Sequence, residues 1–346
     1  MHSTPRILIV RLSAIGDVIH GVPVLNALRA KFPQSFISWI IEGRAADLLE
    51  GHPALDRLIR APRGWIKSPR AVLDVRRRLR EQQFDTTVDL QCLTKSALAA
   101  WLCGAPRRIG AAGKHGRELS RWFNNERVAA DAQHVIEHYL QILRPLGIES
   151  PTVEFNLPES AADAHTAADF LTQAGLEAGN YAILAPGAGW PSKMWPPDRY
   201  AAVADYLGRE RGLPSLIAWG TEQERPLAEQ IVARAPRYTM LAPATTLTEH
   251  ASFARRTRLF VGSDTGPMHL AVAVGAPTIS MHGTSRAEWT GAYGPSNLSL
   301  QARYHDGTAR QRRGASNDAM RAIGVDLVCE ACEQMLGKPL RKVSVA

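Results

Sequence analysis

The sequence predicts an α/β protein made of two doubly wound units, each with a parallel sheet between layers of helices. Short apolar runs rich in β-branched residues alternate with segments of helical periodicity, which is typical of strands buried on both faces of a parallel sheet. The alternation occurs in two series, separated by a polar stretch rich in proline and glycine around residues 144–160. The chain of 346 residues is long enough for two domains of ordinary size.

The elements follow in order along the two series. The first series alternates strands with helical segments, at residues 6–10, 21–33, 36–41, 45–53, 84–91 and 95–106. The second series does the same, at residues 181–189, 198–212, 214–220, 225–236, 238–243, 248–257, 258–264, 268–277 and 278–283. Ligands of such sheets bind beyond the carboxyl ends of the strands, so we expect the loops there to line a cleft between two facing domains.

The composition narrows the class of protein. A formal net charge of +8 attracts anionic partners, without choosing among nucleotides, nucleic acid and acidic lipids. No apolar run approaches the roughly 20 residues that span a bilayer, and no signal-peptide cleavage site is evident, so a cytosolic protein is expected. The four cysteines are expected to be thiols. The motif "CEAC" at 329–332 suits a helix face better than a metal or redox site, since no second pair or histidine cluster accompanies it.

The first strand leads into "RLSAIGDVIHGVP", which places Asp17 in the following turn or at the start of a helix. From the residues alone, helix capping is the simplest role for this carboxylate.

The segment "RLFVGSDTGPMHLAVAVGAP" ends a buried strand in a glycine-rich turn before a helix with Pro267 near its first turn. The N-terminus of that helix could receive a phosphate at Thr265 and Gly266. Asp264 would repel a phosphate, so capping or contact with sugar hydroxyls suits it better, with His269 one turn further along. A capping Asp264 and a core-facing His269 are the structural alternative.

A second glycine-rich loop, "APGAGWPSKMWPPDRY", precedes a helix expected to begin near Pro197. Its glycines allow a ligand to approach the backbone, and Lys193 offers a point charge for a phosphate. An isolated lysine is more often a solvated surface residue.

The stretch from Arg57 to Gln82 holds nine lysines and arginines. For Arg76–Arg80 a solvated helix face is favoured. The part "RAPRGWIKSPR" is expected to be a loop that could bind an acidic acceptor. The sequence lacks a G-x-G-x-x-G motif after its first strand, a G-x-x-x-x-G-K-[ST] phosphate loop and the G-x-S-x-G motif of hydrolases. It also lacks a His/Cys cluster with the spacing of metal ligands.

These segments resemble the ADP-heptose:lipopolysaccharide heptosyltransferases, inverting glycosyltransferases of family 9 with the GT-B fold of two facing Rossmann-like domains. The resemblance spans nearly the whole chain. It is carried by "SAIGDVIHGVPVLNALR", "DLQCLTKS", "KMWP" and above all "GSDTGPMHLAVAVGAPTISMHGTS".

The resemblance implies roles for particular residues. Asp17 matches the catalytic base, and Lys193 matches a lysine on the donor phosphates that assists catalysis. Donor contacts are implied for Ser13, Gly16, Gly189, Lys193, Glu222, Asp264, Thr265, Gly266 and His269. Glu224 competes with Glu222 for contact with the nucleoside. Acceptor contacts are implied for Arg60, Arg63 and Lys95.

The resemblance also implies an acceptor domain at 1–155, a donor domain at 156–325 and a C-terminal helix at 326–346 that packs back toward the N-terminal domain. The implied reaction moves heptose from ADP-heptose to an inner-core sugar of lipopolysaccharide, either Kdo or heptose. No obligatory cofactor, metal or nucleic acid is implied, a divalent cation being at most a stimulant, and peripheral contact with the cytoplasmic face of the inner membrane is expected.

The chain departs from the family in "PGAGWPSK", which lacks paired threonines, and in "MHGTSRAEW", so donor identity is less firmly implied than reaction class. Another hexosyl donor, an epimerase and a non-catalytic glycan-binding protein stay open as alternatives.

Overall fold

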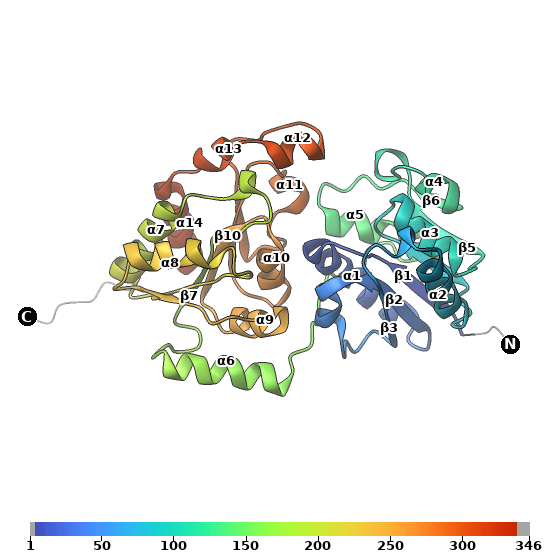
Figure 1. Cartoon of the computed structure of the whole chain (residues 1–346), viewed down its shortest axis with the longest axis horizontal. Coiled ribbons are helices and arrows are strands. Elements are labelled where there is room, and N and C mark those ends of the chain that lie inside the picture. Colours follow the sequence, from blue (N-terminus) through green and yellow to red (C-terminus); the bar gives the residue numbers. More distant parts are fainter. Residues whose placement is uncertain (1–3, 338–346) are drawn as a thin grey trace, which may run out of the picture. The chain divides into compact units, whose positions relative to one another are not determined.

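The computed structural model describes residues 4–337 and divides into two compact units, Met1–Pro158 and Glu159–Ala346 (Figure 1). Residues 148–160 join them without regular secondary structure. The predicted domain boundary after residue 155 falls within this joining segment. Within the described residues no helix is both long and apolar enough to cross a membrane.

Unit 1 contains a six-stranded, wholly parallel sheet of order β3-β2-β1-β4-β5-β6. Its strands are β1 (Arg6–Val10), β2 (Phe36–Glu42), β3 (Arg57–Ala61), β4 (Thr86–Asp89), β5 (Arg107–Ala111) and β6 (Glu126–Val128). Its helices are α1 (Ile15–Lys31), α2 (Pro69–Arg80), α3 (Thr94–Leu102), α4 (Ser120–Phe123) and α5 (Val135–Gln141). Short 3₁₀ helices are η1 (Gly43–Leu49), η2 (Trp65–Lys67), η3 (Gly113–His115) and η4 (Arg144–Leu146).

Unit 2 repeats this arrangement, with sheet order β12-β11-β10-β7-β8-β9 and all pairs parallel. Its strands are β7 (Ala182–Ala185), β8 (Ser215–Ile217), β9 (Thr239–Leu241), β10 (Leu259–Ser263), β11 (Thr278–Met281) and β12 (Asn297–Leu300). Its longer helices are α6 (Ala161–Gln173), α7 (Pro197–Arg211), α8 (Arg225–Arg234), α9 (Leu247–Arg255), α10 (Gly266–Ala273) and α14 (Val325–Leu336). Its short helices are η5 (Pro191–Lys193), α11 (Ala287–Thr290), α12 (Ala309–Gly314) and α13 (Asp318–Arg321).

The prediction of two parallel-sheet α/β units is confirmed. Strands such as β1 and β10 are buried on both faces, because helices cover both sides of each sheet. In unit 2 one core lies under α7, α8 and α14, and a second core lies under α6, α9 and α10. When the strands of each unit are numbered 1 to 6 along the chain, both sheets have the strand order 3-2-1-4-5-6. This is the doubly wound order of dinucleotide-binding folds.

Two local expectations are wrong. Residues 43–49 form the 3₁₀ helix η1 where an α-helical segment was expected at 45–53. The basic segment expected to be a loop begins inside strand β3, whose Ile59 and Ala61 are buried while Arg60 between them is exposed. This alternation marks a strand with one solvated face.

The C-terminal helix α14 buries Val328, Ala331 and Cys332 in the core of unit 2 against α7. The motif "CEAC" is therefore a helix face, as predicted, and Cys329 and Cys332 are both free thiols. Burial raises the pKa of Cys329 to about 11, so it stays protonated at neutral pH. The expected packing of 326–346 toward the N-terminal domain stays a prediction, and residues 338–346 lie outside the described part of the chain.

Candidate active site

Each sheet has one place where the chain connections turn to opposite sides, between β1 and β4 in unit 1 and between β7 and β10 in unit 2. Such a switch point leaves a crevice at the carboxyl ends of the strands, where ligands bind. The loops after these four strands and the starts of the helices that follow them hold most of the predicted site residues: Ser13, Gly16, Asp17 and Lys95 in unit 1, and Gly189, Lys193, Asp264, Thr265, Gly266 and His269 in unit 2. Each unit thus carries a group of candidate site residues of its own.

Asp17 lies in the first turn of α1, where a carboxylate is favoured by the unpaired N–H groups of the helix end. Its Oδ2 lies 2.6 Å from Nη2 of Arg11 and accepts the Ala14 N–H at 3.2 Å. The Asp17 side chain is 40% exposed, whereas that of Arg11 is 7% exposed. A buried cation therefore holds an accessible carboxylate in one orientation.

Arg11 is fixed in turn by the backbone of the neighbouring strand. Its Nη1 donates to the carbonyl oxygen of Leu90 at 3.2 Å, and its guanidinium lies 5.6 Å from the ring centroid of Tyr139. Burial lowers the pKa of Arg11, but the Asp17 carboxylate raises it, and the net shift is upward. Sequence reasoning missed this residue, although a charged side chain directly after an apolar strand was a usable signal.

Ser13 and Gly16 flank Asp17 on the same turn. Ser13 is exposed, Gly16 is half-buried in the first turn of α1, and the Ser13–Ala14 peptide bond is cis. Their predicted contact with the donor stays a prediction.

Lys95, in the first turn of α3, pairs with a carboxylate that sequence reasoning did not single out. Its Nζ lies 2.5 Å from Oε1 and 2.6 Å from Oε2 of Glu42, which is buried at the end of β2. The three N–H donors of an ammonium are not exhausted by one carboxylate, so Lys95 can still meet an anion.

Arg60 forms ion pairs with Asp47 at 2.8 Å and Glu50 at 2.7 Å. A hollow of about 670 Å³ lies at the ends of β2 and β3, lined by Gly43, Arg44, Asp47, Arg60, Ala61, Pro62 and Arg63. The two predicted acceptor arginines therefore line one open hollow, which also contains the Asp47 carboxylate.

Asp89, at the end of β4, is fully buried and was not predicted. It accepts hydrogen bonds from the Cys92 N–H at 2.9 Å and from Nδ2 of Asn124 at 3.0 Å. Burial raises the pKa of Asp89 above its ordinary value, although these hydrogen bonds favour its ionised form. Because Cys92 has a φ of 49°, the carboxylate stabilises a strained turn between β4 and α3.

In unit 2, Asp264 joins Lys193 and His269. Nζ of Lys193 lies 2.6 Å from Oδ2 of Asp264 and 3.0 Å from its carbonyl oxygen, and Nε2 of His269 lies 2.9 Å from Oδ1. Asp264 is buried at the end of β10, and Lys193 is 17% exposed. The structure thus brings together three residues that the sequence placed on two separate segments, Lys193 on one and Asp264 and His269 on the other.

The electrostatics of Asp264 follow from these contacts. Burial by itself raises the pKa of Asp264, but the Lys193 ammonium and the His269 hydrogen bond outweigh it and hold the pKa well below the usual carboxyl range. The alternative of Asp264 as a helix cap is wrong, because Thr265 occupies the N-cap of α10 and its side chain makes no capping hydrogen bond. The Asp264 carboxylate contacts Lys193 and His269 instead.

Helix α10 begins at Gly266, directly after Thr265, whose Oγ1 donates to the carbonyl oxygen of Ser263 at 3.2 Å. No side-chain oxygen of Thr265 occupies the first-turn N–H groups, so this end of the helix suits an anion.

Trp190 lies between two cations. Nζ of Lys193 is 4.8 Å and Cζ of Arg313 is 4.9 Å from the centroid of its ring. Cations at such distances are attracted by the face of an indole. Arg313 belongs to α12, a short basic helix that sequence reasoning did not predict and that packs against η5.

The two candidate nucleoside acids differ in their surroundings. Glu222 is exposed and lies 4.0 Å from Arg225. Glu224 accepts the Gly220 N–H at 2.8 Å, and its carboxyl carbon would lie 2.5 Å from a Cβ added to Gly187. Glycine at 187 thus lets the Glu224 carboxylate approach the loop after β7, whereas Gly189 on the same loop is exposed with open space beside it.

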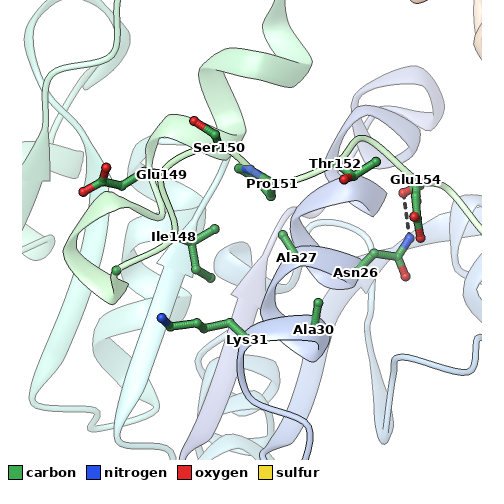
Figure 2. A pocket seen from close by; sticks show the side chains of 11 residues that line it. Asn26, Ala27, Ala30, Lys31, Ile148, Glu149, Ser150, Pro151, Thr152 and Glu154 are labelled. Atoms are coloured by element: carbon green, nitrogen blue, oxygen red, sulfur yellow. Dashed lines mark hydrogen bonds between the residues drawn. The ribbon is translucent and has the colours of Figure 1, made fainter.

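A different hollow of about 340 Å³ lies between the second half of α1 and residues 147–154, where Nδ2 of Asn26 donates to the carbonyl oxygen of Glu154 at 2.6 Å (Figure 2). It contains none of the predicted residues. The α1 residues that line it lie about 14 to 21 Å along the helix axis from Asp17, at a rise of ~1.5 Å per residue. Among the described residues, no group of three or more His, Cys, Asp or Glu side chains could hold a metal ion.

The chain is similar to known proteins of one enzyme family. Residues 72–319 match the model of glycosyltransferase family 9 (heptosyltransferase). Lipopolysaccharide heptosyltransferase 1 of Pseudomonas aeruginosa is 31% identical over 304 residues, which cover 85% of this chain and 83% of the relative. Lipopolysaccharide heptosyltransferase 1 of Escherichia coli K12 is 26% identical over 86% of this chain and 93% of its own length.

Two solved structures share the fold. A family 9 glycosyl transferase from Veillonella parvula superposes with a TM-score of 0.79 at 24% identity, over 96% of this chain and 97% of that one. E. coli heptosyltransferase WaaC with ADP-2-deoxy-2-fluoro heptose superposes with a TM-score of 0.73 at 24% identity, over 95% and 99% of the two chains. The family match covers more than half of the chain, and it includes the Lys193–Asp264–His269 constellation and the Glu224 loop. The chain therefore belongs to glycosyltransferase family 9, the heptosyltransferases, and is a glycosyltransferase.

Proposed function

We propose that this enzyme transfers heptose from ADP-heptose to a hydroxyl of the lipopolysaccharide inner core, on Kdo or heptose, with inversion at the anomeric carbon. The names of the relatives support the acceptor class, and the ADP-sugar in the WaaC structure supports the donor class. The observation that carries the mechanism is Asp17, an accessible carboxylate oriented by the buried Arg11.

Asp17 acts as the general base. Its carboxylate takes the proton of the acceptor hydroxyl while that oxygen forms a bond to the anomeric carbon. The bond from the anomeric carbon to the β-phosphate oxygen breaks, and its electron pair leaves with ADP. One displacement inverts the anomeric configuration.

Lys193 stabilises the departing diphosphate. An ammonium has three N–H donors, and the two contacts to Asp264 leave one for a phosphate oxygen. Asp264 acts as a positioning residue, since it anchors Lys193 on one side and His269 on the other. The N–H groups at the start of α10, beside Thr265 and Gly266, supply further stabilisation as negative charge grows on ADP.

For the nucleoside, the geometry favours Glu224 over Glu222. Glu224 lies against Gly187 on the loop that also carries Gly189 and Lys193, whereas the nearest charged partner of Glu222 is Arg225. A carboxylate accepts hydrogen bonds from ribose hydroxyls, as in dinucleotide-binding folds.

Arg60, Arg63 and Lys95 are proposed to bind the acidic acceptor sugar, since they present cations at the carboxyl ends of β3 and β4 of unit 1. A lipid-linked acceptor also implies peripheral contact with the cytoplasmic face of the inner membrane. The proposed reaction uses no resident cofactor, ADP-heptose being a substrate, and leaves a divalent cation at most a stimulatory role.

The test is a measurement of nucleoside diphosphate release by the full chain, with ADP-heptose, a UDP-sugar or a GDP-sugar as donor, each with and without a lipid-linked Kdo acceptor. Release is expected only when ADP-heptose and acceptor are both present, with a new glycosidic bond of inverted configuration. Transfer from a UDP- or GDP-sugar alone would reassign the donor. Conversion of the donor without acceptor would indicate an epimerase, and binding without turnover would indicate a glycan-binding protein.

A further inference from the structure

Large apolar side chains are exposed mainly on one part of unit 1. Among the described residues six such side chains are exposed, and five of them lie between positions 66 and 122: Ile66 at 43%, Leu73 at 62%, Trp101 at 50%, Leu119 at 53% and Trp122 at 75%. The sixth, Leu327, lies in unit 2. Single exposed apolar residues need no explanation, but a cluster of them indicates an interaction surface.

The helices that carry these residues are neighbours. Nε of Arg80 on α2 donates to the carbonyl oxygen of Leu102 on α3 at 3.3 Å, and the rings of Trp101 on α3 and Phe123 on α4 lie 5.9 Å apart. Helix α3 therefore packs between α2 and α4 (Figure 1). We call Trp101, Leu119, Trp122 and Phe123 the α3–α4 patch.

The same part of the chain holds most of the positive charge. Residues 66–123 contain twelve Lys and Arg against five Asp and Glu, so they carry +7 of the formal +8 of the whole chain. Exposed cations there are Lys67, Arg70, Arg76, Arg77, Arg80, Lys114, Arg117 and Arg121.

The nearby carboxylates cancel only part of this charge. Asp74 pairs with Arg77 at 2.6 Å, and the Glu118 carboxylate accepts the Thr94 N–H at 2.9 Å. Within the patch, the Arg121 guanidinium lies 5.8 Å from the centroid of the Trp122 ring.

We propose that the α3–α4 patch docks on an anionic lipid bilayer, with its indole rings in the headgroup region and the surrounding arginines on lipid phosphates. Tryptophan prefers the membrane–water interface because its ring is apolar and its N–H is polar. Cations around it are attracted by the negative surface potential of the bilayer, and apolar area and charge together set the affinity. The proposal rests on the proposed function, since a lipid-linked acceptor is presented at such a surface.

The test measures cosedimentation of the full chain with vesicles of phosphatidylcholine alone or mixed with phosphatidylglycerol. Wild-type protein is expected to bind the mixed vesicles and to dissociate as salt rises. The double variant Trp101→Ala/Trp122→Ala should bind at least about tenfold more weakly, because it removes most of the inserted apolar area. The pair Arg117→Gln/Arg121→Gln should bind more weakly with a smaller salt dependence, and Leu327→Ala, the exposed apolar residue of unit 2, should bind like wild type.

Each variant is checked by its melting temperature and by transfer to a lipid-free sugar acceptor, both of which should match wild type because the patch contains no proposed active-site residue. If the double variant fails to fold, Trp122→Ala alone serves, since this side chain is mostly exposed. Failure of wild type to bind anionic vesicles, or equal binding by the double variant, overturns the proposal. A dimer that the double variant converts to a monomer would instead assign the patch to a contact between copies. Lipid binding is measured without substrate, so a protein that lacks heptose transfer could still bind vesicles. Failure of the lipid-binding proposal is therefore distinguishable from failure of the proposed transferase activity.

Discussion

At the residue scale, the candidate site residues of unit 1 include an asymmetric ion pair. Arg11 is buried and fixed by the Leu90 carbonyl, whereas Asp17 is accessible, so the pair restricts the carboxylate without covering it. A base oriented before the acceptor arrives loses little entropy in the reaction.

Replacing Asp17 by Asn should lower turnover by about 10²–10⁴-fold, because the amide cannot accept the hydroxyl proton. Donor affinity, measured by calorimetry with ADP-heptose, should stay close to wild type. Asp74→Asn is the matched control, since Asp74 also lies 2.6 Å from an arginine and its side chain is 43% exposed. Wild-type turnover in Asp17→Asn, or an equal loss in Asp74→Asn, would refute the assignment.

At the scale of elements, helix α9 buries a histidine that the proposed mechanism does not use. His250 packs edge-on against Phe260, with 6.1 Å between ring centroids, and no hydrogen-bond partner of its Nε2 is found among the described residues. Burial lowers the pKa of His250 to about 4. The imidazole is therefore neutral in the folded protein at pH 5, whereas in the unfolded chain it is mostly protonated.

This difference predicts how stability depends on pH. The unfolded state binds the proton more readily, so the free energy of unfolding should fall as pH drops from about 6.5 toward 4, with no contribution above pH 7. Between pH 7 and 5 this group accounts for about 2 kcal/mol. In urea unfolding, the free energy of unfolding of His250→Asn should fall less between pH 7 and 5 than that of wild type. His305 is an exposed histidine of the same unit, so His305→Asn should show the same fall as wild type. His138 in α5, whose pKa burial also lowers to about 4, is present in all three chains and does not affect the comparison. An unchanged loss in His250→Asn would contradict the prediction.

At the scale of the whole molecule, each unit has its own sheet and its own core. The residues proposed to hold the nucleotide, Lys193, Glu224 and the start of α10, all belong to unit 2. Binding of ADP should therefore stabilise that unit directly.

Scanning calorimetry should resolve two unfolding transitions, and ADP should raise the melting temperature of the one that belongs to unit 2. At a hundredfold excess of ADP over its Kd, the free energy of unfolding of that unit should increase by about 2.7 kcal/mol. The core variant Val75→Ala identifies the transition of unit 1 by lowering it. Glu224→Gln should reduce the shift caused by ADP, and the matched variant Glu222→Gln should leave it intact. An ADP shift in the transition of unit 1, or a larger effect of Glu222→Gln, would contradict the assignment of the nucleotide site.

Local pattern was enough to predict the central strands, because strands buried on both faces must be continuous apolar runs, as in "RILIV" and "RLFVG". It failed for the edge strands β6 and β12, which are three and four residues long and only partly buried. It also failed for the interior strand β5, which begins with the partly buried Arg107 and Arg108. Arg60 was placed in a loop for the related reason that an edge strand with one solvated face has little apolar signal.

The sequence by itself determined the fold class, the family and the loops that carry the candidate site, since all three depend on residues close together in the chain. Only the tertiary structure decided which side chains meet: Arg11 with Asp17 and Leu90, Lys95 with Glu42, and Lys193 with Asp264 and Trp190. Several of these partners lie some 50 to 80 positions apart and become neighbours through the parallel register of the strands in each sheet. That register results from the packing of helices on both faces of each sheet, a property of the whole unit that no single segment contains.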